Sequence, residues 1–207
     1  MKSSFITLEG IDGCGKSSLI RPIASRLTDA GIAVETTAEP TKTWLGDAVR
    51  RSYGEEVNPY TEAFLFLADR ATHSDWIRNR MEEGKTVISD RYSDSTVAYQ
   101  AALLQQRLGG KSADYINYLQ EIAKPVIITP DITLLLDVDP EISLKRLGGR
   151  SELEKFENLD NLRLVRKNYL EIANKSKHIR VIDASKDIAE VKEQIFAALG
   201  RHFDMEL

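Results

Sequence analysis

The chain has 207 residues, which suffices for one domain with a substantial core and is short for two full domains. Its 28 Lys and Arg residues face 32 Asp and Glu residues, and the net charge of -4 does not favour a nucleic acid polymer as partner. Cys14 is the only cysteine, which excludes an intrachain disulfide and a cysteine metal cluster and fits a reducing compartment. No segment approaches the roughly 18 apolar residues of a membrane span and no signal peptide is recognisable, so we expect a cytoplasmic protein without a membrane partner.

Short apolar runs alternate with longer stretches of helical spacing. The apolar runs predict buried strands at residues 5–8, 32–37, 86–89, 131–138 and 178–183. The other stretches predict helices at residues 16–29, 44–53, 60–83, 94–108, 112–124, 140–147, 158–175 and 187–202. The alternation indicates an α/β fold, a five-stranded parallel sheet with helices on both faces. Paired glycines interrupt a charged pattern within residues 147–158, which predicts a hinged lid on a single domain spanning residues 1–207.

A glycine-rich loop lies between the first strand and the first helix. Gly10, Gly15, Lys16 and Ser17 match the pattern G-x-x-x-x-G-K-[ST]. In such a loop, backbone N–H groups and the N-terminus of the helix face one anion, the lysine reaches the β- and γ-phosphates, and the serine hydroxyl ligates Mg²⁺. The predicted ATP-binding loop comprises Gly10, Ile11, Asp12, Gly13, Cys14, Gly15, Lys16, Ser17 and Ser18. The strand–loop–helix context favours this interpretation over a turn that binds nothing.

Several classes of protein use this loop, and two of them fit poorly. A GTP switch needs Asn-Lys-x-Asp, whereas the string "NKSK" at residues 174–177 lacks the aspartate. The length disfavours a large motor or transporter ATPase. A small kinase that moves the γ-phosphoryl group to an acceptor remains. Two alternatives stay open, a kinase for nucleosides or other acceptors on the same scaffold and a regulatory protein that binds nucleotide without chemistry.

Two later segments supply candidate acceptor residues. Asp90 and Arg91 follow a buried strand, at the sheet edge where ligands bind; the carboxylate can hold the water shell of magnesium and the guanidinium can bind an acceptor phosphate. A surface ion pair is the alternative interpretation of these two residues. Phe66 and Arg70 lie four apart on one helical face, where a ring can stack on a planar base and a guanidinium can bind its edge, although Phe66 taken alone is more typical of a core. The string "AEPT" at residues 38–41, together with Arg50, would line the same cavity.

The motifs in this order resemble the thymidylate kinase family. They read "LEGIDGCGKSS", "AEPT", "FLFLADRATH", "SDRYSDSTVAYQ", "RLGGRSELEKFE" and "IDAS", and the resemblance extends from about residue 4 to 200. The combination of the acidic Asp12 with the later D-R-Y and A-Y-Q strings separates this family from adenylate, guanylate and uridylate kinases. The resemblance implies a P-loop NTPase fold of the nucleoside monophosphate kinase type, transfer of phosphate from ATP to dTMP with Mg²⁺, and a homodimer.

The resemblance also implies roles for individual residues. Asp12 would contact the 3′-hydroxyl of the deoxyribose, Phe66 would stack on thymine, and Arg70 would donate to a base carbonyl. The implied dTMP-binding set is Asp12, Glu39, Arg50, Phe66, Arg70, Arg91, Ser95, Thr96, Tyr99 and Gln100. Within it, Arg50 and Arg91 would clamp the monophosphate and Tyr99 would crowd the 2′ position. The residues implied to read the base edge are Ser95, Thr96 and Gln100.

Two positions depart from the pattern of some family members. Gly13 stands where some members carry a catalytic arginine, so the resemblance places the catalytic arginines in the lid, at Arg146 and Arg150, beside Lys16 and Asp12. Without the other motifs, these two arginines would be interpreted as a solvated helix face. Ala38 stands where many bacterial members have arginine, which leaves the composition of the phosphate clamp open. We assign no catalytic role to any of the three histidines and expect no histidine general base.

Overall fold

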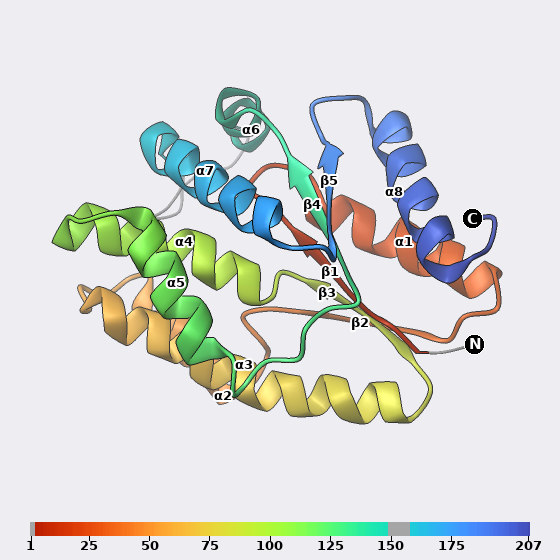
Figure 1. Ribbon diagram of the computed structural model, residues 1–207, viewed down its shortest axis with the longest axis horizontal. Helices are drawn as coiled ribbons and strands as arrows, with labels where there is room; N and C mark the ends of the chain where they lie inside the picture. The colour runs from red at the N-terminus through yellow and green to blue at the C-terminus, as the bar shows by residue number, and fades with distance from the viewer. Residues whose placement is uncertain (1–2, 149–157) are drawn as a thin grey trace.

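The computed structural model describes residues 3–148 and 158–207 (Figure 1). The strands are β1 (Phe5–Glu9), β2 (Val34–Ala38), β3 (Thr86–Asp90), β4 (Ile132–Asp137) and β5 (Ile179–Asp183). They form a five-stranded, wholly parallel sheet in the order β2-β3-β1-β4-β5. This confirms the predicted sheet. Most of the lid predicted at residues 147–158, including Arg150, lies outside the described residues.

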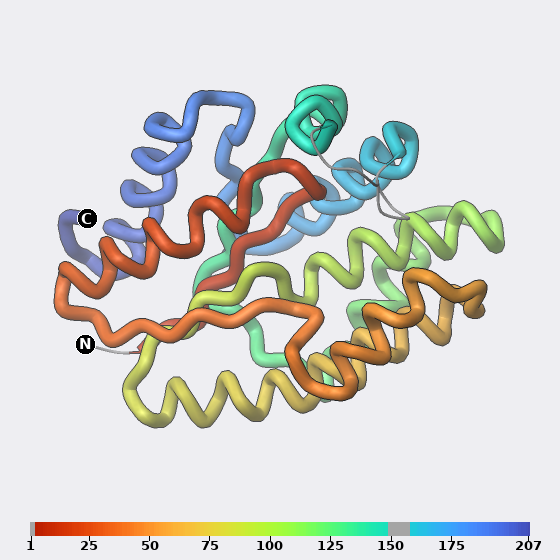
Figure 2. The backbone as a smooth tube through the Cα atoms, turned by 180° about the vertical axis from the view of Figure 1, so that it is seen from behind, coloured from red at the N-terminus to blue at the C-terminus, as the bar shows by residue number. Residues whose placement is uncertain are grey.

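Helices cover both faces of the sheet. They are α1 (Lys16–Asp29), α2 (Trp44–Ser52), α3 (Pro59–Glu82), α4 (Ser93–Leu108), α5 (Ser112–Ala123), α6 (Pro140–Leu147), α7 (Leu159–Lys175) and α8 (Ile188–Phe203). Helices α1 and α8 lie on one face, whereas α3, α4 and α7 lie on the other with α5 packed outside α4 (Figures 1 and 2). The predicted helices each begin and end within one residue of these bounds.

Short-range chemistry determines where many helices begin. The side chains of Thr43, Asn58, Asp139 and Asp187 each accept a hydrogen bond from a backbone N–H in the first turn of the helix that follows. Strand β2 begins two residues later than predicted because Ile32 still donates its N–H to Leu27 O in the turn that ends α1. Local signals therefore position the helices closely, whereas the start of β2 depends on the turn before it.

Apolar side chains from both helix layers pack on the central strands. All of β1 is buried, and α1 contributes Leu19, Ile23 and Leu27, which recur every four residues on one face. Each such side chain contributes about 1.5–3 kcal/mol when it leaves water. This packing holds the strands in place relative to one another.

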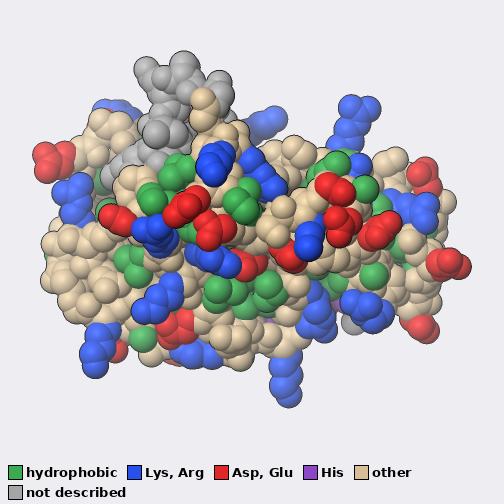
Figure 3. Space-filling model, turned by 90° about the horizontal axis from the view of Figure 1, so that it is seen from above, with side chains coloured by type: hydrophobic (Ala, Val, Ile, Leu, Met, Phe, Trp, Pro, Cys, Tyr) green, Lys and Arg blue, Asp and Glu red, His purple; other side chains and the backbone are tan. Residues whose placement is uncertain are grey.

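The carboxyl ends of β1, β2 and β3 are level. In the sheet register, Leu8 and Ala38 both pair with Asp90. The loops that follow these strands therefore emerge side by side, at the edge where parallel sheets bind ligands. Figure 3 looks onto the molecule from the end toward which β4 and β5 point, where acidic and basic side chains lie next to one another.

Candidate active site

The glycine-rich loop adopts a backbone that only glycine adopts readily. Gly10, Gly13 and Gly15 have φ angles of 140°, 77° and 105°. Gly15 directly precedes α1, and an added Cβ there would meet no atom within 4 Å. The loop thus places open space before the N-terminus of α1, where partial positive charge favours an anion.

The side chain of Lys16 points into the glycine-rich loop and binds its carbonyl oxygens. Its Nζ donates to Gly10 O and Ile11 O, both at 3.0 Å, and lies 3.5 Å from the buried, free Cys14 Sγ. The lysine is only 6% exposed, so its charge is directed at the loop rather than at solvent. A phosphate in the loop would offer this ammonium a charged partner in place of two carbonyls.

Ser17 and Asp90 meet although they come from different segments. Ser17 Oγ donates to Asp90 Oδ2 at 2.9 Å. A hydroxyl and a carboxylate are oxygen ligands of the kind that Mg²⁺ prefers, so this pair fits the predicted metal position. Both residues line a cavity of about 390 Å³, here called the P-loop cavity. Its lining consists of Asp12, Gly13, Gly15, Lys16, Ser17, Ser18, Ala38, Glu39, Asp90, Arg91, Arg146 and Leu147.

Arg91 connects the loop with α4. It has a φ of 70°, rare outside glycine, and its guanidinium holds the Asp12 carboxylate, Ser95 Oγ at 3.0 Å and Gly10 O at 3.3 Å. Burial would raise the pKa of Asp12, but the charges of Arg91 and Lys16 outweigh it and hold that pKa below its ordinary value. Tyr99 OH donates to the second oxygen of Asp12 at 2.6 Å. Asp12 is therefore a fixed carboxylate.

A second cavity of about 300 Å³, here called the Phe66 cavity, adjoins the first. Its lining consists of Asp12, Pro40, Arg50, Tyr53, Phe66, Arg91, Ser95, Thr96, Tyr99 and Gln100. Eight of the ten predicted dTMP-binding residues are among them, Pro40 belongs to the "AEPT" segment expected at this cavity, and the sequence reasoning missed Tyr53. The ring of Tyr53 lies 6.3 Å from that of Phe66, which adds a second aromatic wall. The two cavities share Asp12 and Arg91.

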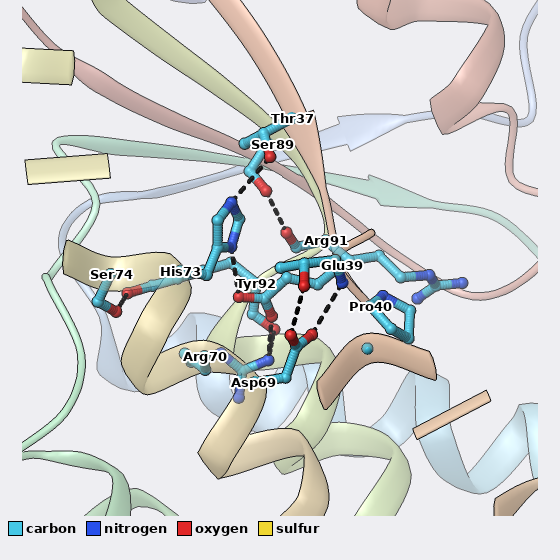
Figure 4. A network of polar contacts seen from close by, with 12 residues as sticks. Thr37, Glu39, Pro40, Asp69, Arg70, His73, Ser74, Ser89, Arg91 and Tyr92 are labelled. Carbon is cyan, nitrogen blue, oxygen red and sulfur yellow. Dashed lines mark hydrogen bonds and ion pairs between the residues drawn. The ribbon is translucent and has the colours of Figure 1, made fainter. Parts of the chain in front are cut away.

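Glu39 and Arg70, the other two predicted residues, do not line the Phe66 cavity. They pair with each other (Figure 4); Arg70 is 1% exposed, and Glu39 lines the P-loop cavity. Arg70 Nη2 also donates to Tyr92 O at 3.0 Å, whereas its Nε and Nη1 have no partner among the described residues. Asp69 holds the nearby chain by accepting from Thr41 N at 2.8 Å. Buried donors without partners are rare and costly, so these two nitrogens point to a missing acceptor.

Arg146, in the last turn of α6, also lines the P-loop cavity. Its Nη1 donates to Ala184 O at 3.0 Å, in the "IDAS" segment after β5. This contact holds the C-terminal end of α6 against the loop that follows the sheet. The described residues thus place one of the two predicted lid arginines at the cavity, and Arg150 is not described.

Two buried residues that support the site, Glu9 and His73, were given no role by the sequence reasoning. Glu9 is 1% exposed and accepts from Tyr92 N at 2.8 Å, Ser95 Oγ at 2.5 Å and Tyr169 OH at 3.0 Å. Burial raises the pKa of Glu9 in spite of these donors. His73 pairs with Glu39 in the same layer. Their partners lie far away in sequence, so no local spacing could reveal them.

Asp94, in the first turn of α4, gives the fold a pH dependence. Burial and the nearby charge of Glu9 raise its pKa from 3.8 to about 7, against the opposing effect of Arg70. Between pH 3.8 and about 7 the folded chain therefore binds more protons than the unfolded chain, and the stabilising contribution of protonated Asp94 is lost as the pH rises through this window. We expect Asp94→Asn to melt near the wild-type temperature at about pH 4 and several degrees higher at about pH 8. The same difference in melting temperature at both pH values would contradict this assignment.

Gly13 packs closely against α6. A Cβ there would lie 2.6 Å from Ser143 O and 2.9 Å from Leu147 Cγ, which leaves no room for a larger side chain. We expect Gly13→Ala to lose about 1 kcal/mol of unfolding free energy through its left-handed backbone and to lower kcat as well, because α6 and Arg146 must shift. Gly84→Ala is the matched control, since Gly84 has a φ of 81° and open space around the added Cβ. Denaturant unfolding measures the stability of both variants, and initial rates measure their kcat. Equal losses of stability with unchanged kcat in both variants would refute the role of the contact between Gly13 and α6.

Comparison with known proteins agrees with this geometry. A sequence model of the family described as thymidylate kinase matches residues 8–195. A relative from Methanococcoides burtonii, named probable thymidylate kinase, is 43% identical over 96% of this chain and 97% of its own length. Relatives with the same name from Methanosarcina barkeri and Archaeoglobus fulgidus are 38% and 40% identical and cover 94% and 92% of this chain and 95% and 91% of their own lengths. The chain belongs to the thymidylate kinase family.

Proposed function

We propose that the protein transfers the γ-phosphoryl group of ATP to dTMP and releases ADP and dTDP. The names of the relatives specify a kinase that acts on thymidylate, and the chain aligns with them over almost its whole length. The match covers both the glycine-rich loop and the residues of the Phe66 cavity. An enzyme that uses both a donor and an acceptor nucleotide needs two such compartments.

The shared border of the two cavities is the observation that carries the proposal. Arg91 and Asp12 line both the P-loop cavity and the Phe66 cavity. A triphosphate on one side and a nucleoside monophosphate on the other would bring their phosphates to the same guanidinium. In-line phosphoryl transfer requires the attacking oxygen and the γ-phosphorus to approach in this way.

The polar atoms near the Phe66 cavity match the edge of thymine. Gln100 Nε2 donates to Glu62 Oε1 at 3.2 Å, which leaves the buried Gln100 Oε1 without a partner among the described residues. That oxygen can accept the N3–H of thymine, while the unpartnered Arg70 nitrogens can donate to a ring carbonyl. Cytosine would present an acceptor to Gln100 and an amino group to Arg70. The arrangement therefore favours thymine or uracil over cytosine.

The sugar and phosphate would lie toward the border of the cavities. Asp12 is a fixed carboxylate that can accept the 3′-hydroxyl, and the Tyr99 ring beside it leaves little room for a 2′-hydroxyl. Arg91 is the principal ligand of the monophosphate. Arg50 extends this clamp from α2, where it is held by Thr41 O at 2.7 Å and Asp47 Oδ1 at 2.6 Å. Ala38 supplies no charge, so two arginines rather than three form the clamp.

The mechanism needs no covalent intermediate with the enzyme. The acceptor phosphate is deprotonated near neutral pH, so no side chain has to remove a proton from it. Lys16, Arg91 and Arg146 orient the phosphates and balance the negative charge that shifts during transfer. Mg²⁺, when bound at Ser17 and Asp90, neutralises charge on the donor phosphates.

Comparing phosphate and hydroxyl acceptors tests the proposal. We expect ADP release in the presence of ATP, Mg²⁺ and dTMP. We expect little release with thymidine, because thymidine has no phosphate for Arg50 and Arg91 to bind. Faster turnover of thymidine would support a nucleoside kinase instead. No stimulation by either acceptor, with ATP still bound, would support a regulatory nucleotide-binding protein.

The same proposal includes the organisation of the chain. Residues 1–207 form one kinase domain whose lid, near residues 147–158, closes when both substrates are bound. No helix among the described residues combines the length and the hydropathy needed to cross a membrane. The single, buried Cys14 supports a reducing, cytoplasmic location.

A homodimer completes the proposal. Trp44 on α2, Phe64 on α3 and Tyr118 on α5 are 76%, 49% and 39% exposed. The ring of Tyr60 lies 6.3 Å from Phe64 and 6.0 Å from Tyr118, so the aromatic side chains of α3 and α5 form one cluster. Exposed aromatic clusters are typical of interfaces. Light scattering on the purified chain distinguishes a dimer from a monomer.

A further inference from the structure

His73 does not line the Phe66 cavity; together with Thr37 it lines a separate cavity of about 930 Å³, which also includes Ser17 and Asp90. It is 4% exposed and follows Arg70 by three residues on α3, so both side chains leave the same face of the helix. Its Nδ1 lies 2.8 Å from Glu39 Oε1, and its Nε2 lies 2.8 Å from Thr37 Oγ1 at the end of β2 (Figure 4). Both nitrogens of the ring are therefore engaged.

The direction of the hydrogen bond between His73 and Glu39 follows from the charges. Burial would raise the pKa of Glu39, but the charge of Arg70 and the contact with His73 hold it below its ordinary value. A carboxylate only accepts hydrogen bonds, so His73 Nδ1 carries the hydrogen and donates it. The Thr37 hydroxyl then fixes the other edge of the ring, which leaves His73 no freedom to turn.

Glu39 passes this constraint to Arg70. Its second oxygen, Oε2, accepts from Arg70 Nη2, which also donates to Tyr92 O at 3.0 Å. The guanidinium carbon lies 5.3 Å from the centre of the Tyr92 ring. Three contacts, from Glu39 and Tyr92, thus determine the plane of the guanidinium, and Nε and Nη1 remain as its donors without partners among the described residues. If the Glu39 carboxylate moved away from Nη2, the guanidinium plane of Arg70 could rotate.

We infer that His73 is a positioning residue that, through Glu39, aims the free donors of Arg70 at the carbonyl of the acceptor base. The inference rests on the proposed function, because it assumes that Arg70 binds the base. The chain of contacts runs from Thr37 through His73 and Glu39 to Arg70, and none of its first three members lines the Phe66 cavity. It predicts that changes at His73 alter base selectivity and leave the use of ATP unaffected.

Two amide substitutions separate the two edges of the ring. The amide nitrogen of Asn occupies the position of histidine Nδ1, whereas that of Gln occupies the position of Nε2. His73→Asn therefore keeps the donor to Glu39, and His73→Gln keeps a polar partner for Thr37 but loses that donor. We expect His73→Gln to raise the KM for dTMP about 10-fold, to lower the preference for dTMP over dCMP by a similar factor, and to change the KM for ATP by less than about 2-fold. His73→Asn should restore most of the wild-type preference.

The outcomes of this comparison are distinct. Equal defects in His73→Asn and His73→Gln, or a wild-type preference in His73→Gln, would overturn the inference. If His73→Gln does not fold, Thr37→Val carries the test, because it frees the other edge of the ring and should lower the same preference by a smaller factor. A wild-type preference in Thr37→Val would then overturn the inference. His178→Gln, on the segment before β5, controls for the loss of a histidine elsewhere. Wild-type enzyme that does not phosphorylate dTMP at all would refute the proposed function instead, a result visible before any variant is measured.

Discussion

Replacing Lys16 with methionine should lower kcat by at least about 1,000-fold, because the substitution removes the buried ammonium that stabilises negative charge on the donor phosphates during transfer. Methionine has nearly the length of lysine and no charge. The present contacts of Lys16 with Gly10 O and Ile11 O show that the ammonium already lies inside the loop, so little movement is needed to reach a bound phosphate. Initial rates with ATP and dTMP, at saturating concentrations of both, measure the effect.

The control for this prediction is Lys124→Met. Lys124 caps the C-terminal end of α5, its side chain is 65% exposed, and among residues 3–148 and 158–207 its one ion pair is with Glu121. Its removal should leave kcat unchanged and stability nearly so. A Lys16→Met enzyme that melts near the wild-type temperature and keeps kcat within about 10-fold would contradict the role of Lys16 at the phosphates.

Replacing Arg91 with alanine should raise the KM for dTMP by about 100-fold and change the KM for ATP far less. Arg91 is the guanidinium shared by both cavities, and its bonds to Asp12 and Ser95 aim it at the border between them. The acceptor monophosphate has few other cationic partners, whereas the donor triphosphate retains Lys16 and the N-terminus of α1. Separate titrations of the two substrates measure the difference.

The unusual backbone at Arg91 calls for a second variant. Its φ of 70° favours glycine, so Arg91→Gly relieves strain that Arg91→Ala retains. Both variants should lose dTMP affinity equally, while the glycine variant should unfold at a higher denaturant concentration. Arg78→Ala, at an exposed ion pair on α3, should change neither KM. Equal increases in the KM values for dTMP and ATP in Arg91→Ala would refute the acceptor role.

Much of the fold follows from short-range features of the sequence. The apolar runs of β1, β3 and β4 predict buried parallel strands, and caps such as Asn58 and Asp139 mark where helices begin. The start of β2 was wrong by two residues because an apolar residue, Ile32, belongs to the turn after α1. The pairing of strands is not local, yet the loop after β1 and the D-R-Y segment after β3 already indicate neighbouring carboxyl ends.

The site was predictable where residues line a cavity and less so where they support it. The resemblance to a family identified Phe66, Arg91 and Tyr99, which the structure places around one cavity. It gave no reason to connect His73 with Thr37, which lies 36 positions earlier, or Glu9 with Tyr169, which lies 160 positions later. Contacts of this kind depend on how the sheet and helices pack, and no spacing in the sequence reflects them.

A panel of nucleoside monophosphates, each assayed with ATP and Mg²⁺, tests most directly whether the Phe66 cavity selects thymidylate. We expect dTMP to have the highest kcat/KM, with dUMP next, since both bases offer N3–H and a carbonyl to Gln100 and Arg70. Turnover of dCMP, dAMP, dGMP and the ribonucleotide of thymine should be lower by at least about 100-fold. A kcat/KM for dCMP or for a ribonucleotide that equals that for dTMP would contradict this assignment of the cavity.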